Sequence, residues 1–193
     1  MLEYLDHIDQ DLLLFLNGLN SPFWDQVMWW MSEQLIWLPL YLVIAGWLIY
    51  KFKWKAVIIL ILVALLITLS DQGSVHLFKE VFKRPRPCHD PDISGMVHLV
   101  RNHCGGEYGF VSSHAANTFA MAAFTLLIIR KRWYSIFIIL WATLVSYSRI
   151  YMGVHYPGDV IGGAILGFLL GFFIYRLYIL IEKKIPPHAL HKA

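Results

Sequence analysis

One short stretch of the sequence, from Ser148 to Asp159, combines three side chains suited to chemistry on a phosphate group. Arg149, His155 and Asp159 supply a cation, an imidazole and a carboxylate. A carboxylate on one ring nitrogen of a histidine fixes the tautomer and leaves the other nitrogen free to attack phosphorus. A guanidinium matches phosphate oxygens. Because Pro157 suits the first turn of a helix, Asp159 is expected where the helix dipole favours a carboxylate. The stretch predicts phosphoryl transfer; the alternative is a chance set of polar residues at a helix end.

A second group of cations lies upstream, in the segment KEVFKRPRP at residues 79–87. Lys79 is expected at the end of a helix, and Arg86 follows a turn forced by a proline. The two cations then approach from different directions, as a tetrahedral anion requires. Lys83 and Arg84 are second choices as phosphate contacts. Taken alone, the segment is also typical of a basic cluster that binds lipid headgroups.

A third polar segment, FVSSH at residues 110–114, precedes a hydrophobic run. Ser112 is a good helix N-cap, so the first free N–H groups of the following helix are expected to point at a bound anion. Ser113 can donate both its N–H and its hydroxyl. Taken alone, the segment is equally typical of a capping serine and an interfacial histidine, His114.

In their order, the three segments resemble the motifs of the type 2 phosphatidic acid phosphatase (PAP2) family, lipid phosphatases that share a histidine-nucleophile fold with vanadium haloperoxidases. The segments match K-x6-R-P, P-S-G-H with departures at Val111 and Ser113, and S-R-x5-H-x3-D. By this resemblance His155 is the nucleophile, Asp159 supports it, and His114 is the general acid. The resemblance implies no metal and no cofactor. The phosphate contacts that it implies are Lys79, Arg86, Ser112, Ser113 and Arg149.

The composition is that of a membrane protein. Of the 193 residues, 58% are hydrophobic and 15% are charged, whereas soluble domains average about 25% charged residues. A single membrane domain over residues 1–193 is therefore expected. Nucleic-acid binding is not expected, because the basic residues are accounted for by loops. No obligate protein partner is predicted.

Five uncharged runs are candidate transmembrane helices: Gln34–Tyr50, Ala56–Ser70, Ala115–Ile129, Trp133–Ser148 and Val160–Tyr175. Each is shorter than the roughly 20 residues that a lone span needs, so polar turns facing the bundle interior are expected to extend them. In the last run, glycines recur every four residues, which favours close helix packing.

The region before these runs, residues 1–33, is predicted to form amphipathic helices on the membrane surface or against the bundle. Its first helix has apolar residues at spacings of three and four: Leu5, Ile8, Leu12, Phe15 and Leu19. The predicted fold is all-α, a polytopic membrane helical bundle with a PAP2/haloperoxidase-like core. Five transmembrane helices occupy residues 34–182, preceded by the interfacial helices.

The basic residues predict the orientation of the bundle. They gather in two loops and after the last run: Lys51, Lys53, Lys55, Arg130, Lys131, Arg132, Arg176, Lys183, Lys184 and Lys192. An odd number of spans puts all of them on one face, the cytoplasmic face by the positive-inside rule. We expect a bacterial inner (plasma) membrane protein with its N-terminus outside, its C-terminus inside and its active site on the periplasmic face.

The only two cysteines, Cys88 and Cys104, lie in the polar loop between the first two motifs. On an oxidising outer face they are expected to form a disulfide that braces the loop over the site. The alternative is a metal site formed by these cysteines with His89 and His103.

These observations predict an integral membrane phosphatase that acts on a lipid phosphate or diphosphate through a phosphohistidine, with the lipid tail held in the bilayer. Undecaprenyl diphosphate is the preferred substrate because the chain suits a compact bacterial enzyme. Phosphatidic acid, phosphatidylglycerol phosphate and lipid A are alternatives. Two other classes stay open: a non-catalytic lipid-phosphate binding or transport protein, and a vanadate-dependent peroxidase.

Overall fold

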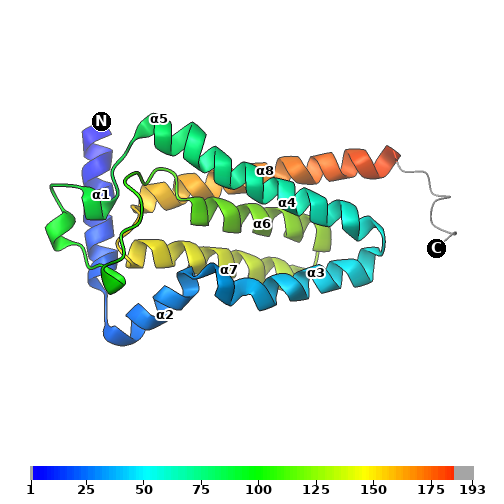
Figure 1. The fold of residues 1–193 in the computed structure, drawn as a ribbon, viewed down its shortest axis with the longest axis horizontal. Helices are drawn as coiled ribbons and strands as arrows, with labels where there is room; N and C mark the ends of the chain where they lie inside the picture. Colours follow the sequence, from blue (N-terminus) through cyan, green and yellow to red (C-terminus); the bar gives the residue numbers. More distant parts are fainter. Residues whose placement is uncertain (1, 185–193) are drawn as a thin grey trace.

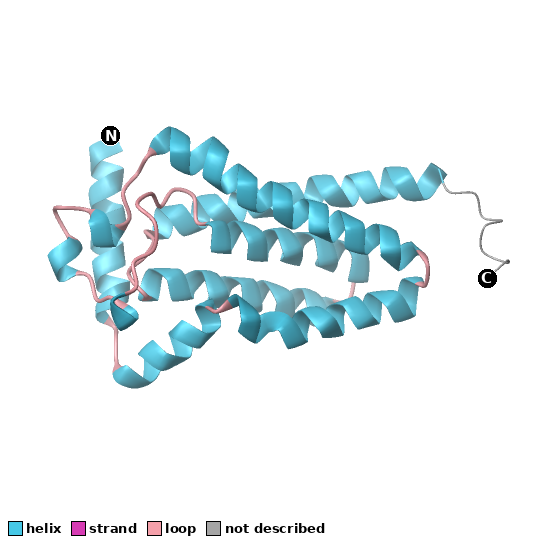
Figure 2. Ribbon diagram, in the orientation of Figure 1, coloured by secondary structure: helices cyan, strands magenta, loops and turns pink. Residues whose placement is uncertain are grey.

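The structure is a computed structural model that describes residues 2–184, with side chains from residue 4 onward. The expectation for Lys192 lies outside the described residues. Within them the chain is helical, and its only β-type pairing is an isolated bridge between Pro85 and Tyr108 (Figure 2). The all-α prediction is confirmed.

Five long helices lie side by side along the long axis of the molecule (Figure 1). They are α3 (Leu38–Phe52), α4 (Lys55–Gly73), α6 (Ser113–Ile129), α7 (Arg132–Tyr151) and α8 (Pro157–Lys184). Two further helices, α1 (Leu2–Gly18) and α2 (Pro22–Ser32), precede the bundle. α1 crosses one end of the bundle, and α2 leads from it towards α3 (Figure 1). The short helices are η1 (Gln34–Trp37), η2 (Ser74–Lys79), α5 (Glu80–Phe82), η3 (Pro87–His89), η4 (Ser94–Met96) and η5 (Val100–Asn102).

Within residues 2–184, four helical stretches are long and apolar enough to cross a membrane: Gln34–Phe52, Lys55–Phe82, Arg132–Tyr151 and Pro157–Lys184. α6 is also apolar but has 17 residues, so length supports four of the five predicted spans. The second stretch continues through the π-helical turns of η2. α8 runs past the predicted end at Tyr175, and Arg176 lies within the helix rather than after it.

Small residues bring α6 and α8 into close contact. The backbones approach so closely that a Cβ added at Gly171 would lie 2.7 Å from the carbonyl oxygen of Ala120. Glycine and alanine at a helix interface permit this kind of packing, which confirms the expectation from the glycine spacing. At the start of the two helices, the Ser112 N–H donates to the Asp159 carbonyl oxygen at 3.0 Å. The packing therefore fixes the second motif against the third.

The amphipathic helix α1 turns its polar face towards the protein. Its predicted apolar stripe is exposed to the surroundings: Leu5, Ile8, Leu12, Phe15 and Leu19. Leu13 and Asn17 are buried instead, and the Asn17 amide donates to the carbonyl oxygens of His98 and Tyr151 at 2.9 and 2.7 Å. The inward face of α1 is mixed, since Leu14 and Leu16 also pack against the core cluster that contains Leu13. The helix therefore packs on the bundle end and still leaves an apolar face suited to a membrane surface.

Candidate active site

The three motifs meet at the end of the bundle that α1 crosses. α4 and α7 end there, and α6 and α8 begin there (Figure 1). The loops that join α3 to α4 and α6 to α7 lie at the opposite end, and α8 runs towards that end (Figure 1). The polar motifs and the basic clusters are therefore separated by the length of the bundle, as the alternation of helix direction predicts.

His155 and Asp159 form a buried pair. The Nδ1 atom of His155 lies 3.3 Å from Oδ2 of Asp159, and the same oxygen accepts the Tyr156 N–H at 3.1 Å. His155 is 1% exposed and Asp159 is 0% exposed. Burial lowers the pKa of His155 well below its ordinary value, and the charges of Arg86, Arg149 and Lys79 lower it further. The ring is thus neutral near pH 7, with Nδ1–H directed at the carboxylate and a lone pair on Nε2.

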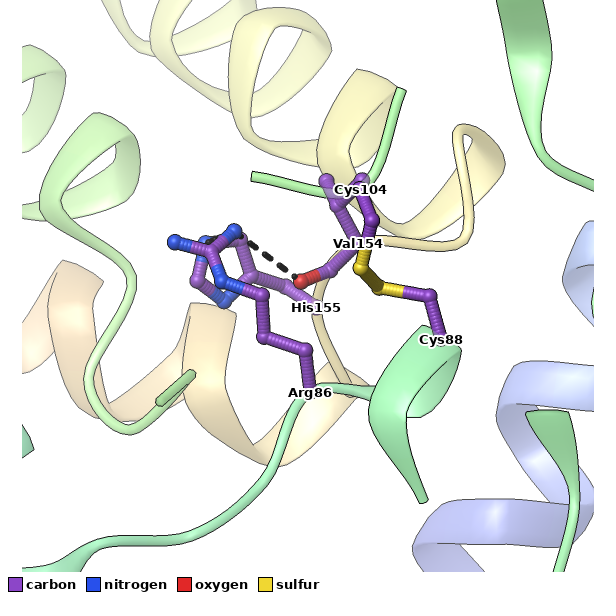
Figure 3. The surroundings of a disulfide bond; sticks show 5 residues. All are labelled: Arg86, Cys88, Cys104, Val154 and His155. Carbon is purple, nitrogen blue, oxygen red and sulfur yellow. Dashed lines mark hydrogen bonds between the residues drawn. A yellow bond between two sulfur atoms is a disulfide. The ribbon is translucent and has the colours of Figure 1, made fainter. Parts of the chain in front are cut away.

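Arg86 faces that free nitrogen. Its Nη1 lies 3.3 Å from both Nε2 of His155 and the carbonyl oxygen of Val154. Figure 3 shows the Arg86 guanidinium next to the His155 ring. Burial lowers the pKa of Arg86, partly offset by the charge of Asp159, but an arginine remains charged at neutral pH.

Arg86 and Arg149 are buried cations without a carboxylate partner. They are 8% and 7% exposed, and the part of the chain that the structure describes offers neither of them an ion pair. The Nε atoms of both guanidinium groups lack a hydrogen-bond partner there, although Nη1 of Arg149 donates to Ser32. Buried charges are normally paired, and buried donors are normally satisfied. Two buried guanidinium groups whose charges both act on the His155 ring are suited to bind an anion.

The other predicted phosphate contacts lie at the start of α6. Lys79 Nζ donates to the Ser113 hydroxyl at 2.8 Å, which also lies 2.6 Å from the Ser74 hydroxyl. Ser112 is the N-cap residue as expected, but its buried hydroxyl makes no capping bond. Ser113, where the family motif has glycine, therefore brings Lys79 to the N-terminus of the helix.

His114 lies in the first turn of α6 and lines two adjoining cavities. The first cavity has a volume of about 520 Å³ and a mixed lining, in which Glu33, His103, His114 and Arg149 lie beside Trp29, Leu35 and Met152. The second cavity has a volume of about 350 Å³ and is largely apolar; its lining includes Trp37, Tyr41, Val63, Ile67, Met121 and Trp141. Both cavities are lined by Ser32, Gln34 and His114. The arrangement suits an amphiphile whose polar and apolar parts meet at His114.

A disulfide joins Cys88 to Cys104 next to Arg86 (Figure 3). Gly105 follows the bridge with φ +91°, and a Cβ there would lie 3.4 Å from Nη1 of Arg86. The bridge therefore holds a backbone turn against the guanidinium. His89 lies close to both sulfur atoms, but a disulfide leaves no thiolate to bind a metal.

Arg84, a second choice as a phosphate contact, is occupied elsewhere. Its guanidinium donates to Asp6, Asp9 and Asp159 at 2.6, 2.8 and 3.0 Å. The ring of Tyr156 lies 4.0 Å from its central carbon. The sequence analysis missed these contacts of Asp6 and Asp9, although their spacing of three residues on the polar face of a predicted helix was an available signal.

Comparison with known proteins places this arrangement in a family. The PAP2 superfamily model matches residues 53–181. The chain is 44% identical over 177 residues to lipid A 4'-phosphatase of Bacteroides thetaiotaomicron, covering 91% of this chain and 79% of that protein. It is 36% identical over 184 residues to lipid A 4'-phosphatase of Porphyromonas gingivalis, covering 95% and 78%.

A solved structure has the same fold. This structure is that of a transmembrane PAP2 type phosphatidylglycerolphosphate phosphatase from Bacillus subtilis. Its TM-score to this chain is 0.68, and the two sequences are 23% identical. The similarity covers 95% of this chain and 89% of that one.

Proposed function

Since this chain belongs to the PAP2 superfamily and is a membrane lipid phosphatase, we propose that it hydrolyses the phosphate monoester of a lipid A-type glycolipid through a phosphohistidine at His155. One observation carries the catalytic part of the proposal. Among the described residues, Arg86 and Arg149 are buried without carboxylate partners, Arg86 lies 3.3 Å from Nε2 of the buried His155 ring, and the charges of both arginines lower the pKa of that ring.

The reaction begins with in-line attack of His155 Nε2 on phosphorus. As the N–P bond forms, the P–O bond to the lipid breaks, and His114 gives a proton to the leaving oxygen. Asp159 stabilises the positive charge that develops on the His155 ring. Water then attacks phosphorus and gives a proton to His114 as the N–P bond breaks, which releases inorganic phosphate and returns His155 to its neutral form.

The proposed phosphate contacts neutralise the charge on the nonbridging oxygens. Lys79, Arg86 and Arg149 supply the positive charges, and Ser112 and Ser113 lie where the N-terminus of α6 offers backbone N–H donors. Because these fixed cations already perform the charge neutralisation that a divalent ion would otherwise supply, we propose turnover without a metal.

The two adjoining cavities support a lipid substrate. The apolar cavity, walled by aromatic side chains such as Trp37, Tyr41 and Trp141, suits an acyl chain, and the charged side chains in the lining of the other cavity suit a headgroup. Lipid A-type substrates replace our preference for undecaprenyl diphosphate, because two relatives matched over most of the chain are lipid A 4'-phosphatases. The motif residues themselves select no tail, which is why the sequence-based preference was weak.

We further propose that the site faces the periplasm in a bacterial inner membrane. The basic loops lie at the opposite end of the bundle (Figure 1), and the positive-inside rule assigns that end to the cytoplasm. A disulfide at the site end fits an oxidising compartment. The N-terminus would then lie outside and the C-terminus inside.

The test is phosphate release by the purified protein, in detergent with EDTA. The substrates are lipid A, phosphatidic acid, phosphatidylglycerol phosphate and undecaprenyl diphosphate. We expect the highest kcat/KM for lipid A, unchanged by EDTA, and loss of release from every substrate in His155→Ala. A higher kcat/KM for another lipid would overturn the substrate assignment, and loss of activity in EDTA would overturn turnover without a metal.

A further inference from the structure

The inward face of α1 contacts the catalytic pair through Arg84. Asp9 Oδ2 and Asp159 Oδ1 accept hydrogen bonds from the same Arg84 nitrogen, Nη1, at 2.8 and 3.0 Å. Asp6 accepts from the other terminal nitrogen, Nη2, at 2.6 Å. Since the second oxygen of Asp159 faces His155, Arg84 determines which carboxylate oxygen is available to the imidazole.

The carboxylates around Arg84 also determine how much negative charge remains at Asp159 to stabilise His155. If Arg84 faced Asp159 alone, the guanidinium would neutralise the charge that has to stabilise a positive His155 ring. Asp9 and Asp6 share that guanidinium, so the group as a whole stays negative. Burial lowers the pKa of Arg84, but Asp159 and Asp9 outweigh burial and raise the pKa above its ordinary value; the cation therefore remains in place.

A second contact fixes Asp9 against the start of α8. Asp9 Oδ1 accepts the Gly158 N–H at 2.8 Å. A Cβ at Gly158 would lie 2.6 Å from Asp9 Oδ2, so only glycine permits this approach without a shift. The carboxylate thus binds both Arg84 and the backbone of the residue that immediately precedes Asp159.

We propose that Asp9 and Arg84 are positioning residues for phosphoryl transfer, holding Asp159 in the orientation and charge state that support His155. The proposal rests on the nucleophilic role of His155 proposed above. It gives α1, a helix whose other face is apolar and exposed, a direct mechanical connection to the catalytic pair.

The test compares Asp9→Asn with Asp11→Asn, a matched control because Asp11 is exposed on the same helix. We expect Asp9→Asn to lower kcat and the rate of phosphoenzyme formation by about tenfold, the lower end of the loss seen when outer-shell partners of metal-ligating histidines are removed, because Asp9 acts on His155 only through Arg84 and Asp159. KM should change less than about twofold, because the phosphate contacts stay in place. Asp11→Asn should match the wild type.

A double-mutant cycle separates positioning from general destabilisation. Gly158→Ala displaces the Asp9 carboxylate from the other side, so its effect on kcat and that of Asp9→Asn should be strongly non-additive. Arg84→Lys keeps the positive charge, but an ammonium group lacks the planar, forked donors with which the guanidinium binds three carboxylates. This variant should fold and should also have a lower kcat.

Three results would overturn the proposal: wild-type kcat in Asp9→Asn, a rise in KM alone, or additive effects in the cycle. His155→Ala, measured alongside, separates this proposal from the proposed function. If His155→Ala is inactive while Asp9→Asn behaves as Asp11→Asn, only the positioning role fails. If His155→Ala turns over normally, the proposed function fails.

Discussion

Among the described residues Arg149 is a buried cation without a carboxylate partner, and we predict that the protein is more stable when this cation is removed. Replacing Arg149 and its hydrogen-bond partner Ser32 by methionine and alanine removes a cation that is 7% exposed and whose Nε has no partner. Replacing both partners avoids leaving a buried hydroxyl unsatisfied. Exchange of a buried ion pair for apolar side chains is often neutral or stabilising by about 1–4 kcal/mol. Because no carboxylate offsets the desolvation of Arg149, we expect the double variant to unfold at a higher temperature in anion-free detergent.

The same change should abolish the response to an anion. A ligand that binds only the folded state at about 100 times its Kd stabilises that state by about 2.7 kcal/mol. Orthovanadate, a phosphate analogue, should therefore raise the unfolding temperature of the wild type and leave that of the Arg149→Met/Ser32→Ala variant almost unchanged. The variant should also lose phosphatase activity, because one of the three cations at the phosphate site is gone.

Arg84→Met is expected to have the opposite effect on stability from the Arg149 double variant. It removes an arginine that carboxylates already neutralise and leaves Oδ1 of the buried Asp159 without its cation; loss of one partner costs about 3–5 kcal/mol for fully buried pairs. The Arg84 side chain is 22% exposed, so the loss should fall at or below the lower end of that range. The reasoning is refuted if the Arg149 double variant unfolds at a lower temperature than the wild type without anion, or if vanadate stabilises both equally.

Two further predictions concern the loop and pH. Cys88→Ser/Cys104→Ser should cost about 3 kcal/mol in the chain-entropy model and weaken phosphate binding through Arg86, seen as a lower unfolding temperature and a higher KM; an unchanged KM would contradict the bracing role. The pKa of His155 is lowered in the folded protein from about 6.5 in the unfolded chain, so the unfolded state binds the extra proton. Stability should be full above about pH 6.5 and fall below it, as measured by thermal unfolding from pH 8 to 5, with a shallower decline in His155→Asn.

The meeting of the three motifs was predictable from the sequence. Spans alternate in direction, so motifs that end one span and begin the next must share a face of the membrane. Pro157 started a helix with Asp159 in its first turn, as its fixed backbone angle predicts. Polar turns were expected to extend the spans, and η2 does extend the second one, whereas α8 continues beyond the run that was predicted to end at Tyr175.

The roles of neighbouring arginines were not predictable. Arg84 and Arg86 are separated by one residue, yet one faces three carboxylates and the other faces His155. Their directions are set by pairing with a distant segment: Gly109 N–H donates to the Arg84 carbonyl at 2.8 Å, and Arg86 N–H donates to the Glu107 carbonyl at 3.0 Å. Local sequence carries no information on such a partner.

The orientation of α1 was also beyond the sequence. The spacing of Leu5 and Ile8 indicated an apolar face, but hydrophobic periodicity does not say whether that face meets protein or lipid. The structure resolves the choice through polar contacts, above all Asp9 with Arg84 and Gly158. A buried polar face is the exception in soluble proteins, and at a membrane surface it leaves the apolar face to the lipid.

The central claim is that phosphorus is transferred to His155 Nε2. The most direct measurement is rapid quenching of the purified enzyme during turnover of a lipid A substrate labelled at its phosphate, followed by mass-spectrometric mapping of the label. We predict label on His155 in the wild type, none in His155→Ala, and accumulation of label when His114 is replaced by Ala and a phosphate ester with a good leaving group is the substrate. Label on another residue, or turnover by His155→Ala at the wild-type rate, would contradict the account.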